Sequence, residues 1–362
     1  MGDAVSGEDA LTPEELQLAT RNRGMPLEAL RYEVTPSGLH YLLVHFDIPD
    51  VDEATWRLDV GGRVLRPLSL DLHELRKMPA RTLPVTMECA GNGRARLSPR
   101  PLSQPWLVEA VSTAVWTGVP LRDVIAAAGV RPGAIELVFT GADHGEQGGE
   151  DQDYERSLSL ADALRPEVLL AYEMNGRPLE PQHGAPLRLI VSGWYGMTSV
   201  KWLTRITAVT EPFRGYQQAV AYRYQRDEDD PGDGVSRIRV RALMIPPGAP
   251  DFFSRRRICE AGEVEVHGRA WSGTAPISRV ELAVDGAWEQ ATLGPQVGEF
   301  AWRGWSYRWH ARPGEHVLSC RATTDTDETQ PLDQPWNYQG MGNNLVQDVL
   351  VTVRPGPHAR HG

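Results

Sequence analysis

The pattern of hydrophobic and polar residues changes character about two thirds of the way along the chain. Before residue 227, short apolar runs typical of strands alternate with amphipathic stretches. The strand-like runs are at 41–48, 56–64 (around a Gly-Gly turn), 83–89, 135–140, 168–176 and 189–191. Beyond residue 234, strand-like runs separated by turn residues follow one another at 240–245, 263–270, 277–284, 300–310, 316–323 and 346–353. Strands mixed with helices, followed by strands alone, predict an α+β domain and then an all-β sandwich.

Three stretches carry helix signals. Thr12 and Glu15 form a capping box with Pro13 at the first helical position. Residues 71–78 indicate a second short helix, and 116–120 introduce a third that Gly129 closes. The acidic, turn-rich stretch 227–234 is typical of a domain boundary, so we expect domains at 1–232 and 233–362.

Composition and charge disfavour several classes of partner and cellular location. The chain has 362 residues and a formal net charge of -11, from 37 basic and 48 acidic residues. This charge disfavours nucleic acid and anionic membranes as partners. No apolar run reaches the roughly 18 residues that span a bilayer, and the start lacks a secretory signal. The 3 cysteines are widely spaced without a Cys-x-x-Cys pair, which favours a reducing compartment and a cytoplasmic location.

The segment 84–99 offers the sharpest chemistry. An apolar run ends at Cys89, and Gly91 and Gly93 then allow a tight turn before Arg94 and Arg96. A thiolate is a soft metal ligand, and guanidinium groups bind oxyanions through forked hydrogen bonds. The segment indicates a metal and oxyanion site, although a buried cysteine beside solvated arginines would give the same pattern.

Two separated segments resemble the sulfite oxidase family. Cys-Ala-Gly-Asn followed by arginine, at 89–94, resembles the family's molybdenum-binding segment. The run 183–202, with His-Gly-x-Pro-x-Arg, a glycine loop and Val-Lys-Trp, resembles its pterin- and phosphate-binding segment. The tryptophans of the C-terminal part resemble the family's immunoglobulin-like dimerisation domain. The resemblance runs in order from about residue 30 to 355.

This resemblance implies a site. It implies a molybdopterin cofactor carrying molybdenum, with Cys89 as metal ligand and no haem in this chain. It implies that Arg94 holds the substrate and that Tyr222 is the active-site tyrosine, with Tyr216 and Tyr224 as competitors. The cofactor-binding residues that it implies are His45, Cys89, Asp143, His183, Arg188, Ser199 and Lys201.

The resemblance also implies an activity, namely oxygen-atom transfer to a small anionic substrate, with sulfite to sulfate as the first expectation. Electrons would pass to dioxygen or to a separate carrier, and the chain would form a homodimer. Nitrate reduction, or another oxo-transfer substrate on the same cofactor, is the alternative within enzymes. A cofactor-free binding module is the alternative from a different class.

Two positions depart from the family pattern. Leu43 and Gln339 stand where the family has substrate arginines. Each missing buried charge-assisted hydrogen bond is worth about 1.5–3 kcal/mol. Either Arg96 or another arginine takes over their role, or the substrate is not sulfite.

Overall fold

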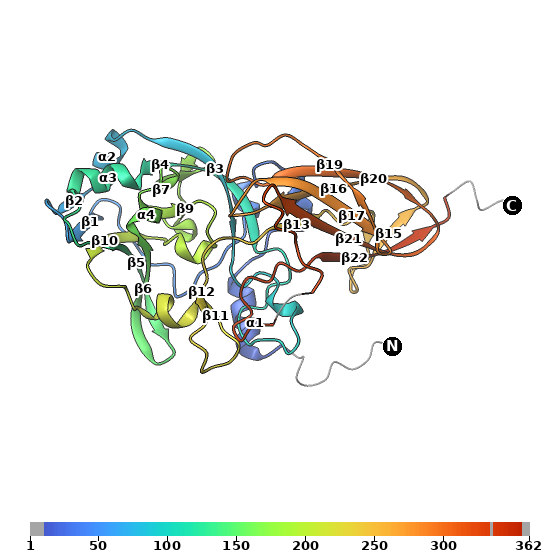
Figure 1. Cartoon of the computed structure of the whole chain (residues 1–362), viewed down its shortest axis with the longest axis horizontal. Coiled ribbons are helices and arrows are strands. Elements are labelled where there is room, and N and C mark those ends of the chain that lie inside the picture. Colours follow the sequence, from blue (N-terminus) through green and yellow to red (C-terminus); the bar gives the residue numbers. More distant parts are fainter. Residues whose placement is uncertain (1–10, 334–335, 357–362) are drawn as a thin grey trace.

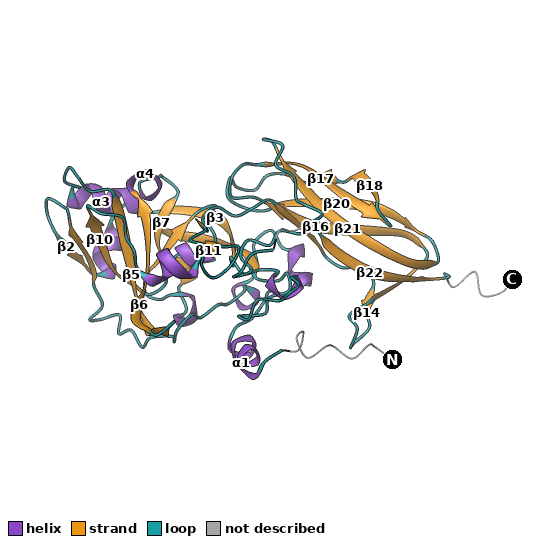
Figure 2. Cartoon of the chain, turned by 60° about the horizontal axis from the view of Figure 1, so that its bottom comes forward, coloured by secondary structure: helices purple, strands orange, loops and turns teal. Residues whose placement is uncertain are grey.

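The computed structural model describes residues 11–333 and 336–356, and it divides into two parts (Figure 1). The N-terminal part mixes sheets with short helices, and the C-terminal part is an elongated stack of strands. Loops gather between the two parts (Figure 2). The structure therefore confirms the predicted fold class of an α+β domain followed by a β-sandwich.

The N-terminal part contains two five-stranded sheets. The first has the order β2-β1-β10-β5-β6, from β1 (Leu58–Gly62), β2 (Leu68–Leu70), β5 (Glu136–Gln147), β6 (Glu150–Ser159) and β10 (Leu203–Val209). The second consists of β3 (Arg81–Glu88), β4 (Val111–Pro120), β7 (Val168–Met174) and β8 (Arg177–Pro178), with β9 (Arg188–Val191) also paired to β7. A small ribbon of β11 (Arg223–Tyr224) and β12 (Asp233–Gly234) leads toward the second part.

The described N-terminal part contains α1 (Pro13–Arg21), α2 (Leu72–Lys77), α3 (Leu121–Ala128) and α4 (Leu160–Ala163). The last three pack against the sheets, whereas α1 lies among loops (Figure 1). The capping box at Thr12 and Glu15 is present, and Gly129 ends α3 with a φ of 69°. Single-turn helices occupy the connections at Leu27–Arg31, Ser37–Leu39, Arg94–Arg96, Pro181–His183, Gly196–Thr198 and Gln217–Ala221. Within the described ranges, no helix is both long and apolar enough to cross a membrane.

Several local predictions in the N-terminal part are wrong. Residues 41–48 form an extended loop that pairs only through a bridge between Leu42 and Arg23, because this segment runs across the site instead of joining a sheet. Both glycines of 61–62 belong to β1 and do not form a hairpin turn. Residues 116–119 lie in β4 and precede α3. Asp143 lies at a bulge inside β5, not beyond a strand end, because the pairing with β6 shifts there.

The C-terminal part is a sandwich of a four-stranded and a six-stranded sheet, in the orders β13-β16-β20-β19 and β14-β15-β22-β21-β17-β18. The predicted strands appear as β13 (Arg241–Met244), β16 (Gly262–Trp271), β17 (Ile277–Val284), β20 (Arg303–Ala311), β21 (Gly314–Thr324) and β22 (Gln347–Arg354). The short additions are β14 (Ala249–Pro250), β15 (Arg257–Glu260), β18 (Ala287–Gln290) and β19 (Thr292–Leu293). Trp305 and Trp309 are buried in its core.

Candidate active site

The loop after β3 places a thiol where two cavities meet. The last four residues of β3 are buried, and the strand ends at Glu88. Cys89 follows directly, and its backbone nitrogen donates to the carbonyl of Ala110 at 2.9 Å. Asn92 holds the following turn by donating to the carbonyl of Val108, and Gly93 adopts a φ of 91°. A side chain at Gly91 would collide with the guanidinium of Arg94 at 2.7 Å. The loop is thus built tightly around a free, buried thiol.

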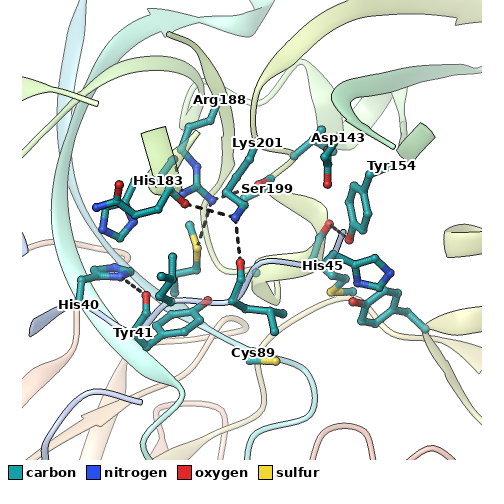
Figure 3. Close-up of a pocket in the computed structure, with 18 residues that line it drawn as sticks. His40, Tyr41, His45, Cys89, Asp143, Tyr154, His183, Arg188, Ser199 and Lys201 are labelled. Carbon is teal, nitrogen blue, oxygen red and sulfur yellow. Dashed lines mark hydrogen bonds between the residues drawn. The ribbon is translucent and has the colours of Figure 1, made fainter. Parts of the chain in front are cut away.

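One of these cavities, the inner cavity, collects almost all of the predicted site residues (Figure 3). It encloses about 670 Å³, its open mouth included. The predicted site residues that line it are His45, Cys89, Asp143, His183, Arg188, Ser199, Lys201 and Tyr222. These residues come from distant parts of the chain, and the fold brings them together.

Arg188 carries a buried positive charge at the wall of the inner cavity. It donates to the carbonyl oxygens of His183 at 3.0 Å and Ser199 at 3.1 Å, and its Nη2 contacts the sulfur of Met87 at 3.6 Å. Burial lowers the pKa of Arg188 to about 10. Among the described residues no carboxylate lies within ion-pair distance of it, and its buried Nε has no hydrogen-bond partner.

Lys201 adds a second cation to the same wall. Its Nζ donates to the carbonyls of Leu43 at 2.8 Å and Gln182 at 3.3 Å, and it lies 4.0 Å from the ring centroid of Trp202. Burial lowers the pKa of Lys201 to about 7. Asp143 also lines the cavity, where burial raises the pKa of its carboxyl to about 6, and its buried Oδ1 has no partner. The wall thus holds one buried acceptor, Oδ1 of Asp143, and one buried donor, Nε of Arg188, that lack a hydrogen-bond partner in the described structure.

The histidines of the cavity are neutral. Burial lowers the pKa of His183 to about 2 and that of His40 to about 4. Their rings meet edge to face at 5.5 Å, and Nδ1 of His40 is bonded to the carbonyl of Tyr41. His45 bonds through Nε2 to Oε1 of Gln147 at 2.7 Å, and burial lowers its pKa as well. These rings offer hydrogen bonds without adding charge.

The second cavity, the outer cavity, is also lined by Cys89, and it shares Leu43, His45 and Tyr222 with the inner cavity. It encloses about 1760 Å³, its open mouth included. Arg94 lines this cavity, not the inner one. It donates to the carbonyls of Gln339 at 2.9 Å and Gln104 at 3.2 Å, and it contacts the sulfur of Met341 at 3.4 Å.

The other arginines near the loop do not add free charge to the outer cavity. Arg96 is exposed and lines neither cavity, so it does not take over the role of a missing substrate arginine. Arg100 lines the outer cavity but forms an ion pair with Glu15. Gln339 lines the outer cavity and donates its amide to the carbonyl of Val220 and to the side chain of Gln225.

The structure separates the three candidate tyrosines. Tyr222 is buried and lines both cavities, and burial raises the pKa of its hydroxyl to about 12. Tyr216 lines only the outer cavity, and Tyr224 packs under Arg239, outside both. Tyr222 is therefore the one of the three that can face a group bound at Cys89.

The sandwich supports the Cys89 loop through a buried polar network. Oε1 of Glu88 accepts from Arg241 at 2.8 Å and from Asn92 at 2.9 Å, and Oε2 accepts from the indole of Trp271 at 2.8 Å. Asn343 donates to the carbonyl of Gly93 at 2.7 Å. The residue next to the thiol is thus fixed by two strands of the other part, β13 and β16.

Sequence reasoning missed several residues of this site. His40 and Tyr154 line the inner cavity, and Glu88 and Arg241 support the loop. Glu88 carried a usable signal, since a charged residue at the end of an apolar strand requires a buried partner. The others follow no motif, because only the tertiary contacts make them neighbours.

The donor set of the inner cavity fits a phosphorylated organic cofactor that carries a metal. The buried charge of Arg188, which has no carboxylate within ion-pair distance among the described residues, calls for an anionic group, since buried charges are paired in folded proteins. Lys201 lies at the same wall, where it interacts electrostatically with Asp143. The unpartnered Oδ1 of Asp143 can accept from the amine or amide groups of a pterin. Within the described part of the chain, no group of three or more His, Cys, Asp or Glu side chains could hold a metal. A metal bound to Cys89 would therefore need ligands from a cofactor.

Comparisons with known proteins agree with this arrangement. Residues 45–217 match the family described as oxidoreductase molybdopterin binding domain, and 235–354 match the Mo-co oxidoreductase dimerisation domain. The chain is 33% identical over 347 residues to mitochondrial sulfite oxidase of Rattus norvegicus, covering 89% of this chain and 62% of that protein. It is 32% identical over 361 residues to nitrate reductase [NADH] 1 of Oryza sativa subsp. japonica, covering 91% of this chain and 39% of that protein.

A solved structure shares the whole fold. The sulfane dehydrogenase SoxCD of Paracoccus pantotrophus superposes with a TM-score of 0.77 at 23% identity, covering 98% of this chain and 95% of the other. At this identity the likeness concerns the fold. The chain spans about three fifths of the length of the sulfite oxidase that it matches.

Proposed function

Because the chain belongs to the sulfite oxidase family of molybdopterin-binding oxidoreductases, we propose that it is an enzyme that transfers an oxygen atom from water to a sulfur-centred oxyanion, with sulfite as the reference substrate. The observation that carries this proposal is the position of Cys89. Its sulfur lies between a cation-rich cavity suited to a cofactor and an open cavity suited to a substrate.

The residues of the inner cavity divide the work of holding the cofactor. Cys89 would be the protein ligand of molybdenum, and a bound metal lowers the pKa of a thiol that burial otherwise raises. Arg188 and Lys201 would hold the cofactor's phosphate, and Asp143 would accept from its pterin. When bound, the molybdenum centre supplies oxygen-atom transfer and takes up the two electrons.

On the substrate side, Arg94 and Tyr222 have distinct roles. Arg94 is held by Gln339, Gln104 and Met341, so its charge is fixed in advance of substrate binding. A preorganised cation of this kind stabilises charge that develops on the reacting anion. Tyr222 stays protonated at neutral pH because burial raises its pKa to about 12, so its hydroxyl can donate to a substrate oxygen.

A second candidate, nitrate reduction, has support from the nitrate reductase of rice, which is nearly as similar to this chain as the sulfite oxidase of rat. The two reactions run oxygen transfer in opposite directions. Sulfite oxidation needs an electron acceptor such as dioxygen or a separate carrier, whereas nitrate reduction needs a donor. The match to a dimerisation domain at 235–354 supports a homodimer in either case, with domains divided near residue 233.

Metal analysis and dye-linked assays test this proposal. We expect about one molybdenum per chain in protein from a host that makes the cofactor, and sulfite-dependent reduction of ferricyanide. The variant Cys89→Ser should lose the metal and the activity. The matched control Cys259→Ser should keep both, because Cys259 lies on β15, outside both cavities.

Each contrary result has a distinct meaning. A protein with full molybdenum could reduce nitrate with reduced viologen as electron donor and fail to oxidise sulfite. That result would make nitrate, not sulfite, the proposed substrate. Protein without molybdenum from a competent host would overturn the enzyme assignment and favour a cofactor-free binding module.

A further inference from the structure

The outer cavity has more room and less charge than an ion such as sulfite requires. It encloses about 1760 Å³ with its mouth. Its charged side chains are Arg94, Arg100 and Glu146, and Arg100 is already paired with Glu15. Glu146 is exposed. Arg94 is therefore the one buried cation among the described lining residues that has no acid partner.

Most of the remaining lining is apolar or aromatic. Leu43 lies at the junction of the two cavities, next to Cys89. Farther out the wall is formed by Leu18, Phe46, Leu102, Val220, Trp336 and Tyr338. Leu102, Val220, Trp336 and Tyr338 are exposed, so the cavity presents large apolar side chains to solvent at its rim. Exposed apolar groups rimmed by polar residues are typical of binding sites.

These two features select a class of substrate. A dianion placed beside a single buried cation keeps an uncompensated charge, which is costly away from water. A monoanion matches Arg94 in charge, and an apolar substituent gains from burial against the cavity wall. The substrate should therefore combine one negative charge with an apolar group.

We infer that the outer cavity binds organic sulfinates, R–SO₂⁻, in which an alkyl or aryl group replaces one oxygen of sulfite. This inference rests on the proposed function, because a sulfinate keeps the sulfur lone pair that oxygen transfer requires. The net reaction is R–SO₂⁻ + H₂O → R–SO₃⁻ + 2 H⁺ + 2 e⁻. One S–O bond forms, the two O–H bonds of water break, and two ferricyanide ions each take one electron in the assay.

The two parts of such a substrate would contact different residues. Arg94 would hold the sulfinate oxygens, with Tyr222 donating to one of them. The organic group would lie toward Leu43 and the apolar wall. Gln339 would add no charge next to the substrate, and its amide group already donates hydrogen bonds to the carbonyl of Val220 and the side chain of Gln225.

Binding of inert product ions tests this inference without turnover. Isothermal titration calorimetry of the molybdenum-containing protein would compare sulfate, methanesulfonate and benzenesulfonate. We expect benzenesulfonate to bind at least about tenfold more tightly than sulfate, with methanesulfonate between them. Tighter binding of sulfate would overturn the inference. Equal binding of the two sulfonates would also overturn it, because the apolar wall would then contribute nothing.

A paired substitution should reverse the preference. In Leu43→Arg combined with Gln339→Arg, two added cations should make sulfate the tighter ligand. The control Leu65→Arg adds one positive charge at an exposed leucine outside both cavities and should leave the preference unchanged. A double variant that still prefers benzenesulfonate would contradict the assignment of this wall.

Steady-state assays separate the failure of this inference from that of the proposed function. We expect kcat/KM for benzenesulfinate to exceed that for sulfite by about tenfold. An enzyme with full molybdenum that oxidises sulfite more efficiently than benzenesulfinate would sink the sulfinate assignment and leave the proposed function in place. Protein without molybdenum would overturn the proposed function, and the same titrations carried out on that protein would decide the ligand class of the cavity.

Discussion

Arg188 and Arg241 are both buried arginines at the start of a strand, but their surroundings differ. Arg241 begins β13 in the sandwich and forms an ion pair with Glu88 at 2.8 Å, with a further bond to the carbonyl of Asn343. Arg188 begins β9 and contacts carbonyl oxygens, the sulfur of Met87 and the ring of Trp116, with no carboxylate within ion-pair distance in the described chain. Both lie close to the Cys89 loop, one on the sandwich side and one on the cavity side.

This contrast distinguishes scaffold from site. The charge of Arg241 is neutralised inside the protein, so removing either partner of its pair leaves a buried charge alone. The charge of Arg188 faces the inner cavity and has no carboxylate within ion-pair distance among the described residues, so it can bind an anion there. The same residue type thus stabilises the loop on one side and leaves a binding site on the other, and the position of the carboxylate decides between the two roles.

The largest effect on stability is expected from breaking the buried ion pair between Glu88 and Arg241. Glu88→Gln should lower the free energy of unfolding by about 3–5 kcal/mol, because Arg241 would remain buried without its counter-charge. Denaturation by urea measures this change. The double variant Glu88→Leu with Arg241→Met should recover more than half of the loss. A Glu88→Gln protein as stable as the wild type would show that the ion pair does not hold the loop.

The next effect concerns the cavity side. In cofactor-free protein, inorganic phosphate at a hundredfold its Kd should stabilise the fold by about 2.7 kcal/mol. Arg188→Gln should lose this stabilisation, as followed by thermal unfolding with and without phosphate. Arg257→Gln is the matched control, since Arg257 is a buried arginine with carbonyl partners that lines neither cavity. Equal stabilisation of both variants would place the anion elsewhere.

The free energy of unfolding should depend on pH, because the buried histidines are neutral in the folded protein and take up protons on unfolding. His40 has a folded pKa of about 4, below its unfolded value near 6.5, so between these values the unfolded state binds more protons. Stability should therefore fall as the pH drops from 6.5 to 4, by up to about 1.4 kcal/mol per pH unit for this histidine. His183 acts in the same direction, down to about pH 2.

Asp143 has the opposite sign, because its folded pKa of about 6 exceeds its usual value of 3.8, and it offsets part of the slope. Unfolding midpoints of cofactor-free protein at pH 4 to 7 measure the sum. His40→Gln should flatten the curve above pH 4. An unchanged slope in this variant would mean that His40 titrates normally in the folded protein.

The smallest effect is expected for an exposed ion pair. Arg256 and Glu315 form a pair at the surface of the sandwich, and both side chains are at least 45% exposed. Arg256→Gln should change the free energy of unfolding by less than about 1 kcal/mol, and salt should remove even that. This variant provides the reference for the Glu88→Gln measurement. A comparable loss in both variants would remove the distinction between buried and exposed pairs.

Local patterns predicted much of the fold. The capping box at Thr12, the glycine stop at Gly129 and the strands of the sandwich all appear as expected, because each depends on residues that are neighbours in sequence. Residues 41–48 have strand composition but form a loop that lines the site, with one bridge from Leu42 to Arg23. Asp143 was recognised, but its bulge was not, because a shift in register involves two strands.

The sequence alone therefore predicted most of the elements and a thiol in a tight loop after a strand, and the family resemblance proposed the residues that would hold a cofactor. The tertiary structure decided which of those charges are neutralised. Glu15 reaches Arg100 across 85 residues and Glu88 reaches Arg241 across 153, whereas Arg188 has no carboxylate within ion-pair distance in the described chain. Periodicity and capping act over a few residues, but electrostatic pairing depends on distance in space, and distance in space is fixed only when the sheets and the sandwich have packed together.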